Sequence, residues 1–272
     1  MLDLTYQWII PNRHRSAPAG YCLTVLDFEK AMLKMIADLY LLPVSMYNQG
    51  SINGGCMEIT WYGHSCFRIT ERNLASVVTD PYDHRAVGHD PLKLKADIVT
   101  VSHAAPGHNY LNGVKGEPFI ISGPGEFEIG GVFITGVQTN GHTKKTTDEP
   151  RNTLYLIDYN GINVLHLGAI NRVPTQTEVE TLGPVHIVLV PVGGGSGLNA
   201  AKAAEIISLL EPNLVIPMHY ATPQSTIKLE PLSKFLKEMG LTAVTTQPSL
   251  KVTSVNSLPE ETQVIVLDPV GN

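Results

Sequence analysis

The stretch that decides the fold is MEITWYGHSCFRIT (57–70), in which two short β-branched and aromatic runs flank a tight turn. EITWY (58–62) and CFRIT (66–70) are typical of two β-strands, and His64 lies in the turn between them. Similar short runs recur further along the chain at ASVVTD (75–80), DIVTVS (97–102), PFIIS (118–122), GVFITGV (131–137), TLYLID (153–158) and INVLHL (162–167). The first part of this region therefore reads as consecutive strands.

The rhythm then changes to an alternation of helices and strands. Helices are predicted at 175–183, 199–211 and 231–240, the second with Asn199 as its N-cap and the third ending at Gly240. Strands are predicted between and after them at HIVLVPV (186–192), NLVIPMHY (213–220) and TQVIVLD (262–268). Strands first and interleaved helices later predict an α/β protein with two sheets and helices outside them, a four-layer αββα sandwich.

Residues 1–56 show none of this strand pattern. Positions 25–42 have the apolar spacing of one amphipathic helix that Pro43 ends, and 45–56 read as a linker. One interpretation is that Met57 is the true initiator and 1–56 is a mis-assigned start; the other is an N-terminal extension that docks on the domain or on a partner. The sequence favours the first, because the pattern of the 57–272 domain is complete without the segment.

Composition excludes several classes of protein. The chain has 272 residues, 43% hydrophobic and 16% charged, with a net charge of −6 and no basic run, so neither a disordered chain nor a nucleic-acid partner is expected. No apolar stretch reaches the roughly 18 residues of a membrane span. Three scattered cysteines indicate reduced thiols. We expect a cytoplasmic protein whose partners are a small-molecule ligand or a second copy of itself, not a membrane.

The ten histidines carry the functional signal. SHAAPGHN (102–109) follows a predicted strand directly, so that His103 and His108 flank a tight turn. His219 ends the strand PMHY, and His142 lies in the polar loop TNGHTKKTTDEP. Side chains at the ends of strands, on loops held by a rigid scaffold, are where binding sites are usually found. Each of these histidines is either a metal ligand or a hydrogen-bonded pocket residue, and the sequence alone leaves both open.

These stretches resemble the metallo-β-lactamase superfamily, and more closely its small Zn-dependent hydrolases grouped with L-ascorbate-6-phosphate lactonase. The similar segments are MEITWYGHSCFRI, VVTDPY, DIVTVSHAAPGHN, ISGPGEFEIGGVFITGV, RNTLYLIDYNGINVLHLGA, VHIVLVPVGG and LEPNLVIPMHY, in the family's order from Met57 onward. The resemblance implies the αββα fold and metal-dependent hydrolysis of a phosphorylated or ester-like small molecule, with zinc as the cofactor.

The metal ligands that the resemblance implies are incomplete. The family loop His-x-His-x-Asp-His keeps its first and last histidines as His103 and His108, but Ala105 and Gly107 replace the middle His and the Asp. Ala169 stands where the family has a bridging Asp. His219 matches the last ligand and His142 the remaining loop histidine. The expected ligands are thus His103, His108, His142 and His219, whereas His64, Asp80, Ala105, Gly107 and Ala169 are expected to line the pocket, with Asp80 as a brace.

Three losses from one constellation favour a degenerate member with weak or no hydrolase activity, and no catalytic residue is assigned. One alternative is an active hydrolase of a phosphoester or lactone that uses a histidine-only site, in which Asp83, His84, His89 or Asp90 could supply replacement ligands. The other is a non-catalytic ligand-binding or interaction protein that needs no metal.

Overall fold

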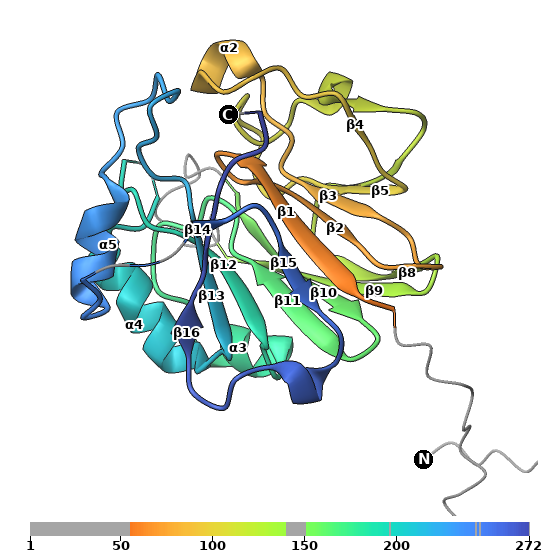
Figure 1. Cartoon of the computed structure of the whole chain (residues 1–272). Coiled ribbons are helices and arrows are strands. Elements are labelled where there is room, and N and C mark those ends of the chain that lie inside the picture. The colour runs from red at the N-terminus through yellow and green to blue at the C-terminus, as the bar shows by residue number, and fades with distance from the viewer. Residues whose placement is uncertain (1–54, 140–150, 196, 243, 245, 272) are drawn as a thin grey trace, which may run out of the picture. The chain divides into compact units, whose positions relative to one another are not determined.

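The computed structural model describes residues 55–139, 151–195, 197–242, 244 and 246–271 (Figure 1). The helix predicted at 25–42 and the loop histidine His142 lie outside these residues. The domain boundary at Met57 therefore stays a prediction. No helix in the described ranges is both long and apolar enough to cross a membrane.

The first sheet is built around the opening stretch of sequence. Its six strands lie in the order β15 (Leu250–Val252), β1 (Met57–Gly63), β2 (Cys66–Thr70), β3 (Val77–Thr79), β5 (Ile98–Thr100) and β7 (Phe119–Ile121). β1 and β2 pair antiparallel, with Ile59 opposite Ile69 and Trp61 opposite Phe67. These four side chains are buried, because alternate residues of a strand point to the same face.

The second sheet has seven strands, in the order β16 (Gln263–Val264), β13 (Leu214–Met218), β12 (Ile187–Pro191), β11 (Ile162–His166), β10 (Thr153–Tyr159), β9 (Val132–Gln138) and β8 (Gly125–Ile129). β11, β12, β13 and β16 run parallel. Helices α3 (Gln176–Leu182), α4 (Ala200–Leu210) and α5 (Leu232–Glu238) lie in the connections, as parallel strands require. α4 and α5 pack together on the side of this sheet that faces away from the first sheet (Figure 1).

A shorter layer covers the outer face of the first sheet. Val78, Val99 and Cys66 pack there in one cluster with Tyr82 and Val87. The covering segment carries α2 (His84–Val87), the 3₁₀ turn η2 (Leu111–Gly113), and β4 (Leu94–Lys95) paired with β6 (Val114–Lys115). Helical and loop layers on both sides of two sheets confirm the α/β class and the αββα arrangement.

The end of the chain differs in detail from the sequence prediction. The strand predicted at 262–268 divides into β16 and β17 (Val266–Leu267), since β16 pairs with β13 but β17 pairs with β14 (Thr246–Gln247). η3 (Val255–Ser257) precedes them. The strands predicted at 75–80 and 97–102 are three residues long. At their carboxyl ends Asp80 has φ 40°, outside the range of a strand, and the amide of Ser102 donates to the Asp80 side chain.

Two buried tyrosines of β10 connect the sheets. The hydroxyl of Tyr159 donates to the carbonyl oxygens of Ala75 (2.6 Å) and Ile69 (3.1 Å), in and beside the first sheet. Tyr155 likewise bonds the carbonyl of Val101 at 3.1 Å. Burial raises the pKa of both phenols, so they remain protonated donors at every ordinary pH.

Tyr159→Phe is expected to lower the free energy of unfolding by about 1–2 kcal/mol, because two buried carbonyl oxygens lose their donor. Urea unfolding measures the change. Tyr62→Phe is the matched control, at a half-buried hydroxyl with no hydrogen-bond partner among the described residues, and should cost less than about 0.5 kcal/mol. Equal effects of the two substitutions would show that the inter-sheet hydrogen bonds contribute nothing.

Candidate metal centre

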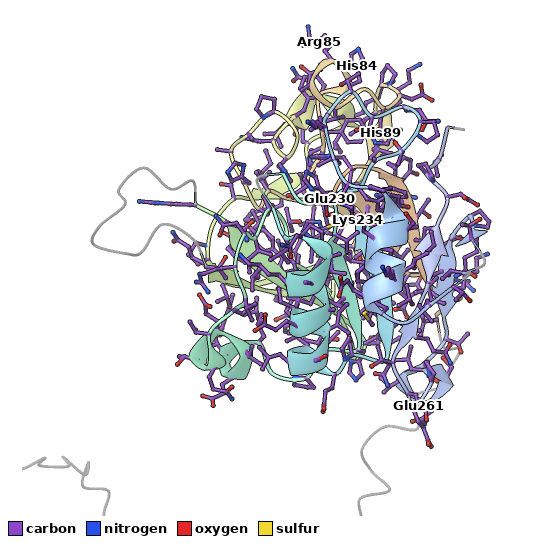
Figure 2. All side chains as sticks on the ribbon, turned by 90° about the vertical axis from the view of Figure 1, so that its left-hand side faces the viewer. His84, Arg85, His89, Glu230, Lys234 and Glu261 are labelled. Atoms are coloured by element: carbon purple, nitrogen blue, oxygen red, sulfur yellow. The ribbon has the colours of Figure 1, made fainter. Side chains whose placement is uncertain are left out.

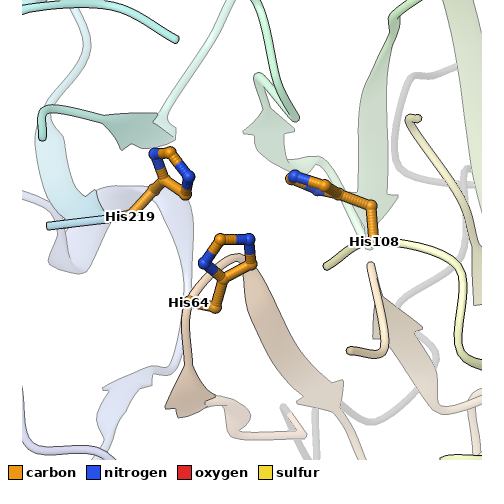
Figure 3. Close-up of side chains that lie close together, drawn as sticks. All are labelled: His64, His108 and His219. Carbon is orange, nitrogen blue, oxygen red and sulfur yellow. The ribbon is translucent and has the colours of Figure 1, made fainter. Parts of the chain in front are cut away.

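Three histidines from separate parts of the chain converge at one end of the two sheets (Figure 3). A ligand nitrogen of each of His64, His108 and His219 lies within 4.8 Å of the others. As whole residues they are 4%, 5% and 9% exposed. The rings of His64 and His219 have centroids 4.5 Å apart, and those of His64 and His108 are 5.0 Å apart. Among the described residues, no Asp, Glu or Cys joins this group.

The backbone that presents these side chains is unusual. His64 in the β1–β2 turn has φ 50°, and His219 directly after β13 has φ 52°, both in the left-handed region. The amide of His219 donates to the carbonyl of His64 at 3.0 Å, and the indole of Trp61 donates to the same oxygen at 3.2 Å. Left-handed non-glycine residues cost free energy and concentrate at functional sites. The fold therefore holds His64 and His219 side by side through their own backbones.

Asp80 supports the third histidine from behind. This carboxylate is fully buried and accepts hydrogen bonds from the Ser102 amide (2.7 Å), the Ser102 hydroxyl (2.5 Å) and Nδ1 of His108 (2.7 Å). Since Nδ1 of His108 carries the proton, Nε2 is the nitrogen with a free lone pair. A carboxylate behind a histidine in this way is the arrangement that fixes the tautomer of metal-binding imidazoles.

The charge states of the site suit a cation. Burial and the neighbouring rings of His219 and His108 hold the pKa of His64 well below its usual value. Burial and His108 lower the pKa of His219 to about 4. Burial by itself would raise the pKa of Asp80, but His166 and His108 outweigh it, so the carboxyl pKa is lowered. At neutral pH His64 and His219 are thus neutral imidazoles and Asp80 is an ionised carboxylate, the protonation states that metal binding needs.

Metal-free protein is expected to lose stability as pH falls from about 6.5 to 4. In that window the unfolded chain protonates His219 and the folded chain does not, so the free energy of unfolding falls, by about 3 kcal/mol from this residue. Urea unfolding at pH 7.5 and pH 4 of the wild type and of His219→Gln measures it. The variant should show a drop smaller by that amount, and an identical drop in both would contradict the assignment.

A cavity of about 160 Å³ opens over the three histidines, lined also by Ala105, Gly107, Gly195, Ile227 and Leu229. Gly107 matters sterically, because a Cβ at this position would lie 2.8 Å from Nε2 of His64. The His64 ring thus occupies the space beside residue 107 that the family's aspartate would need. Ala105 and Gly107 lie in the wall of this cavity, and the absence of a side chain at Gly107 leaves room for the His64 ring.

His103 lies beside this group and not within it. Its ring centroid is 5.6 Å from that of His108, and the ring is half-buried in a neighbouring cavity. Nδ1 of His103 accepts the amide hydrogen of Ala105 at 3.2 Å. Of the four expected ligands, the structure therefore gathers His108 and His219, leaves His103 at the rim, and does not describe His142.

The reserve ligands of the loop after β3 lie elsewhere. His84 and Arg85 project from α2 at the tip of the molecule, where both contact Asp83 (Figure 2). His89 is buried against Tyr82, with ring centroids 5.7 Å apart. None of them joins the three-histidine group.

Residue 169 is fixed by an asparagine that the sequence did not single out. The side-chain oxygen of Asn152 accepts from the Ala169 amide at 2.7 Å, and its NH₂ group donates to the Leu167 carbonyl at 3.2 Å. Gly168 has φ 58°, and a Cβ there would lie 2.4 Å from the Ser102 hydroxyl. In the sequence, Asn152 belongs to the family-like segment RNTLYLID, but nothing there marks it as a site residue. No sequence motif points to Ile227 or Leu229 as residues of the site.

Comparison with known proteins identifies the family of this chain. Residues 58–219 match the family model of the β-lactamase superfamily domain. A UPF0173 metal-dependent hydrolase of Thermococcus onnurineus is 26% identical over 196 residues, which are 61% of this chain and 85% of the relative. A crystal structure from Thermotoga maritima, of a candidate Zn-dependent hydrolase of the metallo-β-lactamase superfamily, is 33% identical, covers 78% of this chain and 98% of its own, and has a TM-score of 0.63.

A further solved structure, of the metallo hydrolase Igni18 from Ignicoccus hospitalis, shares the fold at 21% identity and a TM-score of 0.53, over 72% of this chain and 97% of its own. The family model spans the segment from β1 to the last of the three histidines, and so includes every residue of the candidate centre. The chain belongs to the β-lactamase superfamily domain family.

Proposed function

We propose that this protein is a single-metal hydrolase of reduced activity, whose ion is held by His64, His108 and His219. The observation that carries the proposal is the convergence of three buried imidazoles within 4.8 Å, with Asp80 behind one of them. Three histidines with an open fourth position are one of the ligand sets of catalytic zinc. Imidazole ligands also suit iron, copper and nickel, so the residues themselves favour a first-row transition metal. The choice of zinc among these metals rests on the family resemblance.

A divalent ion bound there would supply Lewis-acid polarisation of a carbonyl or phosphoryl oxygen and activation of water. The chain's own residues contribute position and charge. Asp80 keeps His108 in the tautomer that presents Nε2. The backbone hydrogen bond from the His219 amide to the His64 carbonyl holds two of the ligands side by side. Ile227 and Leu229 give the cavity apolar side chains beside the three histidines.

The reduction in activity follows from the missing carboxylates. Ala105, Gly107 and Ala169 offer no ligand and no general base, and the carboxylate of Asp80 is already used by three donors. General acid–base help is typically worth 10²–10⁴-fold in rate. We therefore expect turnover well below that of a complete two-metal site, in line with the weakly active member that the sequence favours.

The test is hydrolysis of p-nitrophenyl phosphate, bis(p-nitrophenyl) phosphate and γ-butyrolactone by untagged protein, metal-free and loaded with Zn²⁺ or Mn²⁺. Slow turnover of at least one compound, lost on chelation and in His219→Ala, supports the proposal. Equal rates with and without metal would overturn it. Tight metal binding without turnover of any compound would also overturn it, in favour of a non-catalytic binding protein.

A further inference from the structure

A second, larger cavity adjoins the histidine cavity. It has a volume of about 500 Å³, within the range of small-molecule sites, and Ala105 lines both cavities. His103 lies in its wall, with its ring 5.6 Å from that of His108. A molecule in this cavity would therefore have one end next to the three-histidine group.

The charged side chain in the described lining of this cavity is positive. Among the described residues that line it, Arg151 is the one cation and none is Asp or Glu, although the protein as a whole has a net charge of −6. Arg151 is exposed, and no carboxylate of the described residues lies within ion-pair distance of it. What distinguishes Arg151 is its place in the wall of a cavity of this size. A guanidinium binds carboxylate or phosphate through two parallel N–H donors.

The remaining polar groups of the wall can donate as well. Because Nδ1 of His103 accepts the Ala105 amide, the neutral ring of His103 carries its proton on Nε2, which makes that nitrogen a donor. Asn109 and Ser122, also in the wall, have an amide NH₂ and a hydroxyl. In the part of the wall that the structure describes, one cation and several donors without a carboxylate are complementary to a ligand with negative charge.

We infer that this cavity binds the anionic group, phosphate or carboxylate, of a small molecule, with Arg151 as the specificity-determining residue. The position of the ligand's other, reacting end rests on the proposed function, since that end would lie past Ala105, at the three histidines. Binding of the anion itself does not require the metal. The two proposals can therefore fail separately.

The experiment is calorimetric titration of metal-free, chelator-treated full-length protein with phenyl phosphate, phenylacetate and the neutral benzyl alcohol, at low and high salt. We expect phenyl phosphate or phenylacetate to bind, benzyl alcohol to bind at least tenfold more weakly, and the anion affinity to fall with salt. Arg151→Gln should weaken anion binding about tenfold or more. Arg151→Lys should weaken it less, because the positive charge stays, but should still weaken it, because the two parallel N–H donors of the guanidinium are lost.

Arg72→Gln is the matched control, at an exposed arginine in the turn after β2, and should bind as the wild type does. A preference for phenyl phosphate would identify a phosphate site, and equal binding of both anions a general anion site; either supports the inference. Anion binding unchanged in Arg151→Gln, or absent from the wild type, would overturn it. Zinc titration of the same samples reports on the three-histidine centre independently.

Discussion

Replacing His64 with alanine is expected to lower the affinity of the protein for Zn²⁺ by more than about 100-fold. Loss of a residue that only supports a ligand already costs 10- to 100-fold, and loss of one of three ligands should cost more. His64 is the ligand that the motif comparison does not provide, so its removal separates the observed site from the one implied by resemblance. Competition with a chromophoric chelator measures the affinity, and circular dichroism checks that the variant is folded.

His103→Ala is the matched control for this result. It removes a neighbouring imidazole, on the loop that carries His108 and with its ring centroid 5.6 Å from that of His108, that lies outside the three-histidine group. Zn²⁺ affinity should stay within a few-fold of the wild type. Loss of zinc in His103→Ala together with its retention in His64→Ala would contradict the ligand assignment and restore the sequence-based ligand set.

The second large effect is expected at Asp80, where alanine should lower the free energy of unfolding by about 3–5 kcal/mol. Three buried donors, the amide and hydroxyl of Ser102 and Nδ1–H of His108, would lose their acceptor. Asp80 also has φ 40°, a left-handed conformation that aspartate tolerates better than alanine does. Urea unfolding of metal-free protein gives the number.

Two further variants make this result specific. Asp97→Ala removes an exposed carboxylate that also accepts two bonds, from the amide and hydroxyl of Ser76, and should cost no more than about 1 kcal/mol. Asp80→Asn keeps the shape and should weaken Zn²⁺ binding 10- to 100-fold, because His108 loses its charged partner. If Asp80→Ala costs no more than Asp97→Ala, Asp80 does not brace the site.

The fold follows from the sequence because its signals are local. Alternation in 57–70 predicts β1 and β2, and Asn199 and Gly240 mark where helices begin and end to within a residue or two. What local pattern cannot predict is where a strand stops in favour of side-chain bonds. Asp80 and Ser102 have strand-like sequence neighbours, yet Asp80 has a left-handed backbone and Ser102 bonds its side chain, just past the ends of β3 and β5. The division of 262–268 between two sheets depends likewise on distant partners.

The site was only partly predictable for the same reason. His108 and His219 follow strands and match family positions, and Asp80 was expected as a brace, the role that its hydrogen bonds support. His64 was expected only to line the pocket, because nothing in the sequence shows that Gly107 leaves room for its ring. That contact joins residues 43 positions apart and exists only in three dimensions.

The most direct test of the three-histidine centre is a crystal structure of zinc-loaded protein, with anomalous diffraction data on either side of the zinc absorption edge. The account predicts one anomalous peak about 2.0–2.1 Å from a nitrogen of each of His64, His108 and His219. No peak after loading, or a peak bonded to His103 and not to His64, would contradict it.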